Sequence, residues 1–167
     1  MPFWRSFAHL VWTTKNRRPL IRPQIEGALY ACLVSRAAEM GCYVHAVNGM
    51  ADHVHVVISI PPKLSVSDVV KNMKGSSSHF VNHELTPRPE PFAWQRGYGY
   101  LSLGESQCAQ AVAYVENQKQ HHQLNSTNSW LERVDEDEEQ DEATSPSPFR
   151  QIREERAVYQ AFDELPF

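Results

Sequence analysis

The pattern of apolar and polar residues divides the first half of the chain into strand-like and helix-like stretches. Residues 7–14 and 42–49 are rich in β-branched and aromatic residues and predict strands. Between them, residues 24–40 carry apolar side chains at helical spacing. A third strand-like run covers residues 53–60, and the two prolines at 61–62 end it. The first half therefore predicts the order strand, helix, strand, strand.

The second half predicts two more helices and one more strand. Ser65-Val66-Ser67-Asp68 is a variant of the capping box with Asp in place of Glu, and it opens a helix that reaches about Asn82. A Pro-rich loop leads to residues 92–103, which predict a strand or a bent hairpin, and residues 106–122 predict a helix. The complete order indicates a small α+β domain of ferredoxin-like type, an antiparallel sheet with helices packed on it.

The charges divide the chain into two parts. Residues 1–131 carry 12 Lys+Arg, 8 Asp+Glu and all 8 histidines, whereas residues 132–167 carry 4 Lys+Arg and 12 Asp+Glu. We therefore predict one mildly basic domain over 1–131 and an acidic, largely flexible tail over 132–167, with a short helix possible at 150–162. The acidic run at 135–142 predicts a solvated linker; the alternative is a mimic of DNA that covers a basic surface.

Several classes of protein are disfavoured by the sequence. Charged or histidine residues interrupt every apolar run before it reaches the length of a membrane span, and the first residues lack the pattern of a signal peptide. Three cysteines without a CxxC pair argue against a disulfide framework or a zinc ribbon. We expect a cytoplasmic protein without a membrane partner.

The two histidines in Asp52-His53-Val54-His55 are the first candidate site. A strand repeats every two residues, so His53 and His55 point to one face with Cα atoms ~6.6 Å apart, and both imidazoles can reach one metal ion. A histidine pair on a half-exposed strand without metal has the same pattern. Val57 stands where a histidine-triad hydrolase has its third histidine, and the motifs of a zinc deaminase are absent. His9 is expected to be structural.

The predicted helix with Tyr114 and Gln118 is the second candidate site. The two residues lie four positions apart and so share a helix face, and His121 lies near Gln118. Because Val112 and Val115 are expected to face the core, Tyr114 and Gln118 should project outward, toward a cleft or solvent. An amphipathic helix with a surface tyrosine has the same spacing.

Together the two candidate sites have the residue types of a phosphodiester-transfer site. A divalent ion held by two imidazoles and an amide oxygen withdraws charge from a non-bridging phosphate oxygen. A tyrosine that attacks phosphorus keeps the energy of the broken bond in a phosphotyrosine, so rejoining of the strand needs no ATP.

The same residues resemble a family of DNA transposases. His53-Val54-His55 matches a His-hydrophobic-His (HUH) motif, and Tyr114-Val115-Glu116-Asn117-Gln118 matches the helix motif of single-tyrosine enzymes. The chain is similar to single-tyrosine HUH transposases, particularly the REP-associated tyrosine transposases of bacteria, over residues 7–122. The other matching motifs are His9-Leu10-Val11-Trp12-Thr13-Thr14-Lys15, Ser65-Val66-Ser67-Asp68-Val69-Val70-Lys71, Lys74-Gly75-Ser76-Ser77-Ser78 and Trp94-Gln95-Arg96-Gly97-Tyr98-Gly99.

This resemblance implies metal-dependent cleavage and rejoining of DNA strands. His53, His55 and Gln118 would bind Mg²⁺ or Mn²⁺, and Tyr114 would attack single-stranded hairpin or repeat DNA to give a 5′-phosphotyrosine and a free 3′-hydroxyl. Many members are homodimers with the tyrosine helix docked on the partner's HUH strand, whereas REP-associated members can be monomers. Because two imidazoles favour manganese over magnesium, we expect Mn²⁺ to support activity at least as well.

Basic and small residues predict a path for the DNA. Lys71 and Lys74 lie on one helix face, where they would contact phosphates or form an ordinary solvated surface. Trp94, Tyr98 and Tyr100 would stack on unpaired bases or, for Trp94 and Tyr100, belong to the core. The predicted DNA-binding residues are Lys15, Arg17, Arg18, Lys71, Lys74, Ser76, Ser77 and Arg96.

Two other functions fit the same sequence. A non-catalytic regulator on the same scaffold would bind DNA hairpins without cleaving them. A metal-dependent phosphodiesterase would use water as the nucleophile in place of Tyr114.

Overall fold

The computed structural model describes residues 3–85, 89–129 and 131–134. All described residues lie within the unit Met1–Glu136, which the description below concerns. The predicted acidic linker and the predicted helix at 150–162 lie outside the described residues. Within those residues, no helix is both long and apolar enough to cross a membrane.

The described residues form the predicted α+β fold. The elements are β1 (Phe7–Thr13), the 3-10 helix η1 (Lys15–Arg17), α1 (Pro23–Glu39), β2 (Tyr43–Gly49), β3 (His53–Ser59), α2 (Val66–His83), β4 (Gly99–Leu103), α3 (Glu105–Glu116) and α4 (Gln118–Gln123). The four strands form one sheet in the order β2-β3-β1-β4, and each neighbouring pair is antiparallel.

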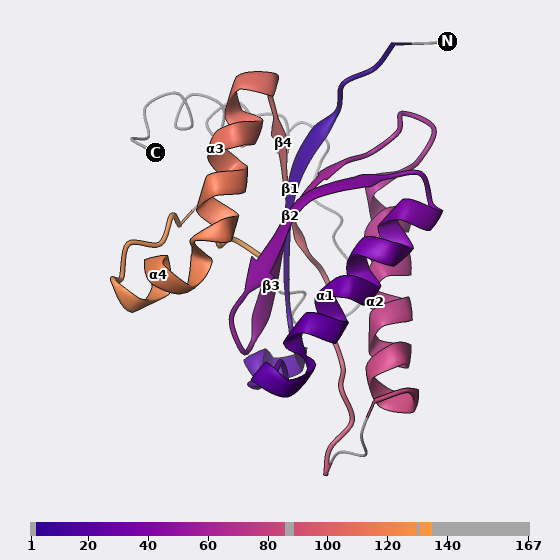
Figure 1. The fold of residues 1–167 in the computed structure, drawn as a ribbon, viewed down its shortest axis with the longest axis vertical. Helices are drawn as coiled ribbons and strands as arrows, with labels where there is room; N and C mark the ends of the chain where they lie inside the picture. Colours follow the sequence, from indigo (N-terminus) through magenta and orange to yellow (C-terminus); the bar gives the residue numbers. More distant parts are fainter. Residues whose placement is uncertain (1–2, 86–88, 130, 135–167) are drawn as a thin grey trace, which may run out of the picture. The chain divides into compact units, whose positions relative to one another are not determined.

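Helices cover both faces of this sheet, with α1 and α2 on one side and α3 and α4 on the other (Figure 1). On the side of α1 and α2, Trp12, Val54 and Val56 belong to the same buried cluster as Leu33 and Met73. This confirms the prediction that Val54 and Val56 enter the core. The alternate residues of β1 and β3 point to the other face, on which α3 packs against β1, β2 and β3. That face carries the histidines.

The predicted helix at 106–122 is two helices rather than one. Asn117 has φ −94° and ψ 13°, which ends α3 and turns the chain into the short α4. The prediction that Tyr114 and Gln118 project outward is wrong, because Tyr114 is only 6% exposed and Gln118 is fully buried. This face of α3 packs toward the sheet, since α3 contacts three of its strands. The periodicity showed that the two residues share a face but not which way that face points.

The predicted strand at 92–103 is shorter in the structure. Only β4 is regular, and Trp94 forms an isolated bridge with Thr14. The indole of Trp94 packs edge-on against Trp12 and donates a hydrogen bond from Nε1 to Ser77 Oγ at 2.9 Å. Trp94 therefore belongs to the core packing, whereas Tyr100 is 49% exposed.

Replacing Gly49 by alanine is expected to lower the free energy of unfolding by about 1–3 kcal/mol. Gly49 pairs with Val54 in the β2–β3 hairpin, and a Cβ there would overlap the backbone of His53 and Val54. Urea unfolding measures the effect. The matched control is Gly27→Ala in α1, where nothing lies within 4 Å of the added Cβ; it should stabilise the helix by about 0.5–1 kcal/mol. Equal effects of the two variants would contradict the prediction.

Candidate metal and nucleophile site

The candidate site is built on two histidines of β3, which lie on the sheet face covered by α3. His53 is 4% exposed and His55 is fully buried, opposite Thr13 and Val11 of β1. Each imidazole uses its Nδ1 on a neighbouring side chain, which holds the ring in one orientation. His53 Nδ1 lies 2.7 Å from Asp52 Oδ1, and His55 Nδ1 lies 3.0 Å from His9 Nε2. This leaves both Nε2 atoms for the site, as in histidines that bind metals.

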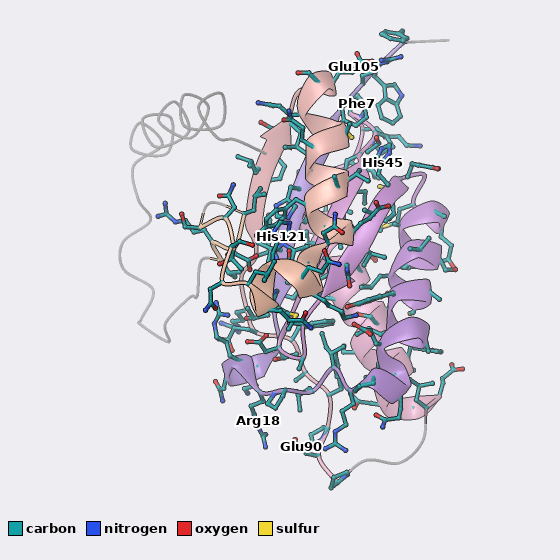
Figure 2. The ribbon with its side chains drawn as sticks, turned by 60° about the vertical axis from the view of Figure 1, so that its left-hand side comes forward. Phe7, Arg18, His45, Glu90, Glu105 and His121 are labelled. Carbon is teal, nitrogen blue, oxygen red and sulfur yellow. The ribbon has the colours of Figure 1, made fainter. Side chains whose placement is uncertain are left out.

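The end of α3 and the start of α4 bring Tyr114 and Gln118 over these histidines. The rings of His55 and Tyr114 lie edge to face with centroids 6.3 Å apart. The ring of Tyr114 also stacks on that of His121 in α4, with centroids 4.6 Å apart. The phenol is therefore held between the sheet and α4, near His121 in Figure 2. The structure thus brings the four predicted residues together within one chain.

Glu132 lies between these four side chains. Its Oε1 accepts hydrogen bonds from Tyr114 Oη at 2.8 Å and from Gln118 Nε2 at 2.7 Å. Its Oε2 lies 3.2 Å from His55 Nε2 and 3.5 Å from His53 Nε2. Glu132 belongs to the predicted acidic tail and is not one of the predicted site residues. No motif distinguishes it there from the other acidic residues.

The residues around Glu132 are anchored to the domain. Leu131 is fully buried, and the carbonyl of Arg133 passes so close to Gly99 of β4 that a Cβ there would overlap it. Before them, the backbone N–H of Asn128 donates to Tyr114 Oη at 2.9 Å. The chain after α4 therefore supplies a donor and an acceptor to the tyrosine hydroxyl.

His122 of α4 is a further imidazole beside the site. Its ring centroid lies 4.9 Å from that of His53, and its Nε2 lies 3.7 Å from Glu132 Oε2. His53, His122 and Glu132 each offer a ligand atom, and these atoms all lie within 4.8 Å of one another. His122 is not one of the ligands predicted from the sequence.

Burial and hydrogen bonding set the charges of the site. Burial lowers the pKa of His55 and lowers that of His9 well below its usual value, so both imidazoles are neutral. Burial opposes ionisation of Glu132, but hydrogen bonds from His55, Gln118 and Tyr114 outweigh it and lower the pKa of the carboxyl. Burial raises the pKa of Tyr114, so the phenol keeps its proton. Neutral imidazoles and an ionised carboxylate are the forms that bind metals.

The atoms of this site fit a divalent cation. Among the described residues, His53 Nε2, Gln118 Oε1 and His122 Nε2 are buried and make no hydrogen bond. Leaving buried polar atoms unpaired costs about 1–3 kcal/mol each, unless a ligand pairs them. Imidazole nitrogen and amide oxygen both have lone pairs for a cation, and Asp52 supplies the outer contact that orients His53.

The predicted basic residues near the first strand lie in an exposed loop. Lys15, Arg17 and Arg18 are exposed in and after η1, which follows β1 directly. Arg17 lies 3.8 Å from the carboxylate of Asp52, and Arg18 pairs with Glu90 (Figure 2). This loop therefore starts beside the His53 end of the site.

The predicted DNA-binding residues of α2 divide into two groups. Lys71 of α2 is exposed. Arg96, in the loop before β4, is exposed as well. Lys74 instead donates from Nζ to the carbonyls of Gln95 at 2.6 Å and Gly97 at 2.8 Å, and burial lowers its pKa to about 8. The hydroxyls of Ser76 and Ser77 donate to carbonyls of their own helix, to Asn72 at 2.8 Å and Lys74 at 3.1 Å, and Ser77 is fully buried.

The sequence and the fold are similar to those of known transposases. Residues 3–118 match the family described as "Transposase IS200 like". The ISDra2 transposase TnpA of Deinococcus radiodurans is 30% identical over 114 residues, which cover 66% of this chain and 81% of that protein. The transposase for insertion sequence element IS200 of Salmonella typhimurium is 28% identical over 120 residues, 69% of this chain and 78% of that protein.

Two solved structures share the fold. One is the crystal structure of a protein described as a transposase from Deinococcus radiodurans R1, with a TM-score of 0.55, 28% identity, and coverage of 70% of this chain and 93% of that chain. The other is a REP-associated tyrosine transposase bound to a REP hairpin, with a TM-score of 0.55 and 14% identity over 78% of this chain and 76% of that chain. The second likeness concerns the fold alone.

Proposed function

This chain belongs to the IS200-like family of HUH single-tyrosine transposases, and from that premise we propose that Tyr114 is its nucleophile and that His53, His55 and Gln118 hold its divalent cation. The observation that supports this most strongly is the convergence of the four side chains on one point. All four come from the same chain, so in this proposal a single copy would carry the whole site. A homodimer would then combine two complete sites.

The proposed substrate is single-stranded DNA that folds into a hairpin or contains a repeat element. A REP-associated transposase with the same fold is bound to a REP hairpin in its structure. In this chain, the exposed basic side chains of Lys15, Arg17, Lys71 and Arg96 are suited to contacts with phosphates. Lys74 instead binds the loop before β4, and Ser77 binds the Trp94 side chain. Both would contribute to DNA binding indirectly, by positioning these groups. The reaction would take place in the bacterial cytoplasm.

The reaction is an exchange of one phosphodiester bond for another. Tyr114 Oη forms a bond to phosphorus while the bond from phosphorus to O3′ breaks, and the proton of the phenol is needed on the departing O3′. A divalent cation held by His53, His55 and Gln118 would withdraw charge from a non-bridging phosphate oxygen. When a 3′-hydroxyl attacks the 5′-phosphotyrosine, the same exchange runs in reverse and joins two strands.

The test of this proposal is the formation of a covalent protein–DNA adduct. Labelled single-stranded hairpins, taken from inverted repeats that flank the gene, are incubated with the full chain and Mn²⁺, and the products are separated on a denaturing gel. We expect a labelled band at the mass of protein plus DNA. Cleavage without an adduct would indicate water as the nucleophile, and binding without cleavage across several metals would indicate a non-catalytic regulator.

Replacing Asp52 by asparagine is expected to weaken Mn²⁺ binding by about 10- to 100-fold. The carboxylate of Asp52 accepts from His53 Nδ1 and so fixes which nitrogen of the ring faces the site. Titration with Mn²⁺ in the absence of DNA measures the affinity, and adduct formation should recover at saturating Mn²⁺. The charge-matched control is Glu39→Gln, on an exposed pair with Arg36. An unchanged Mn²⁺ affinity in Asp52→Asn would contradict the orienting role.

A further inference from the structure

Glu132 is the one carboxylate among the described residues that contacts both the histidines of β3 and the pair Tyr114 and Gln118. The predicted set of metal ligands does not include it. The match to the family covers residues 3–118, so Glu132 and His122 lie beyond it. The position of Glu132 is nevertheless well defined by five side chains of the site.

The distances around Glu132 Oε2 lie within or slightly above those between ligands of one metal ion. At a metal–ligand distance of about 2.0–2.1 Å, neighbouring ligand atoms lie roughly 2.9–3.4 Å apart in octahedral or tetrahedral geometry. Oε2 lies 3.2 Å from His55 Nε2, 3.5 Å from His53 Nε2 and 3.7 Å from His122 Nε2. A cation between these atoms needs only small side-chain movements to contact all of them.

The charge balance of the site also favours a cation at this place. The side chain of Glu132 is only 20% exposed. The contacts that the structure gives it are to a phenol, an amide and imidazoles, and none is to a Lys or Arg of the described residues. A carboxylate withdrawn from water is normally paired with a positive charge or coordinates a metal. A divalent cation would supply that charge.

The backbone around Glu132 explains how the side chain reaches the site. Leu131 is buried beside it, and Gly99 leaves room for the carbonyl of Arg133 at the surface of the sheet. A larger residue at Gly99 would push this segment away from β4. The chain therefore holds Glu132 between two anchored neighbours, which is the precision that a metal ligand requires.

We propose that Glu132 is a ligand of the divalent cation, added by the segment after α4 to the set formed by His53, His55 and Gln118. This inference rests on the proposed function for the identity of the other ligands. In this proposal the carboxylate has two roles. Its Oε2 binds the cation, and its Oε1 accepts from the hydroxyl of Tyr114 and so keeps that hydroxyl beside the cation. His122, which faces Oε2, lies within reach of the same cation.

The experiment measures Mn²⁺ binding by the full-length chain without DNA, from the electron paramagnetic resonance signal of free Mn²⁺ during a titration. The variants are Glu132→Gln, which keeps the shape but loses the charge, and Glu132→Asp, which keeps the charge on a shorter side chain. The charge-matched control is Glu84→Gln at the exposed end of α2. Circular dichroism confirms that each variant is folded.

We expect Glu132→Gln to lower the affinity for Mn²⁺ by about 10- to 100-fold, Glu132→Asp to lower it less, and Glu84→Gln to leave it unchanged. An affinity in Glu132→Gln equal to that of the wild type would overturn the proposal. So would a higher affinity together with faster adduct formation, which would mean that the carboxylate competes for the site. Absence of Mn²⁺ binding by the wild-type chain would overturn it as well.

The outcome is distinguishable from failure of the proposed function. Tyr114→Phe removes no proposed ligand, so it should bind Mn²⁺ like the wild type even though it forms no adduct. If the adduct persisted in Tyr114→Phe while Glu132→Gln lost Mn²⁺ affinity, the assignment of the nucleophile would be wrong and the ligand role of Glu132 would stand.

Discussion

Replacement of Tyr114 by phenylalanine is expected to abolish the covalent protein–DNA adduct. The change removes only the phenol oxygen, which is the atom proposed to bond to phosphorus. Loss of a catalytic nucleophile lowers the rate on the order of 10⁶-fold, so the adduct should fall below detection on a denaturing gel. The ring remains stacked on His121 at 4.6 Å, and the fold should therefore be kept.

The matched control is Tyr30→Phe in α1. This variant also loses one hydroxyl that donates a hydrogen bond to a carboxylate, here that of Glu26 at 3.0 Å. Tyr30 lies outside the site. This variant should form the adduct as the wild type does. An adduct that survives in Tyr114→Phe would mean that another side chain attacks the DNA, and cleavage without an adduct in that variant would mean that water does.

Local rules of the sequence were sufficient for the first three strands and for the pair of histidines on β3. Alternation along β3 predicted that Val54 and Val56 enter the core and that His53 and His55 share the opposite face. The N-cap of α2 was also predicted, and Ser65 Oγ accepts from the backbone N–H of Asp68 at 3.1 Å. These features depend on residues a few positions apart, which is why a pattern in the sequence can specify them.

Contacts between distant parts of the chain could not be predicted in this way. His9 reaches His55 across 46 positions, and Glu132 reaches His55 across 77. The orientation of Tyr114 was predicted wrongly for the same reason, because the residues that cover it include His55 of β3 and Asn128 after α4. Lys74 has the spacing of a phosphate-binding lysine, and only the course of the loop at 95–97 shows that its ammonium group binds carbonyls.

Replacement of His53 by alanine is expected to eliminate metal-dependent cleavage and to leave hairpin binding largely intact. His53 supplies one of the buried nitrogens without a hydrogen bond, so its loss removes a proposed ligand. Charge stabilisation by a metal is worth several kcal/mol, and the rate of adduct formation should fall by about 10³-fold or more. Hairpin binding is expected to depend mainly on contacts with phosphates and bases elsewhere, and a gel-shift assay in EDTA measures it separately.

The comparison with EDTA identifies the cause of this loss. Chelation should inactivate the wild type to the same extent, and added Mn²⁺ should restore the wild type but not His53→Ala. His83→Ala is the matched control, because His83 is an exposed histidine of α2 that stacks on His79 away from β3. If His53→Ala cleaved DNA at the wild-type rate in the presence of EDTA, a metal-binding role of the β3 histidines would be excluded. Loss of both hairpin binding and cleavage would instead mean that His53 supports the DNA-binding surface, since loss of a metal ligand should affect cleavage and leave binding intact.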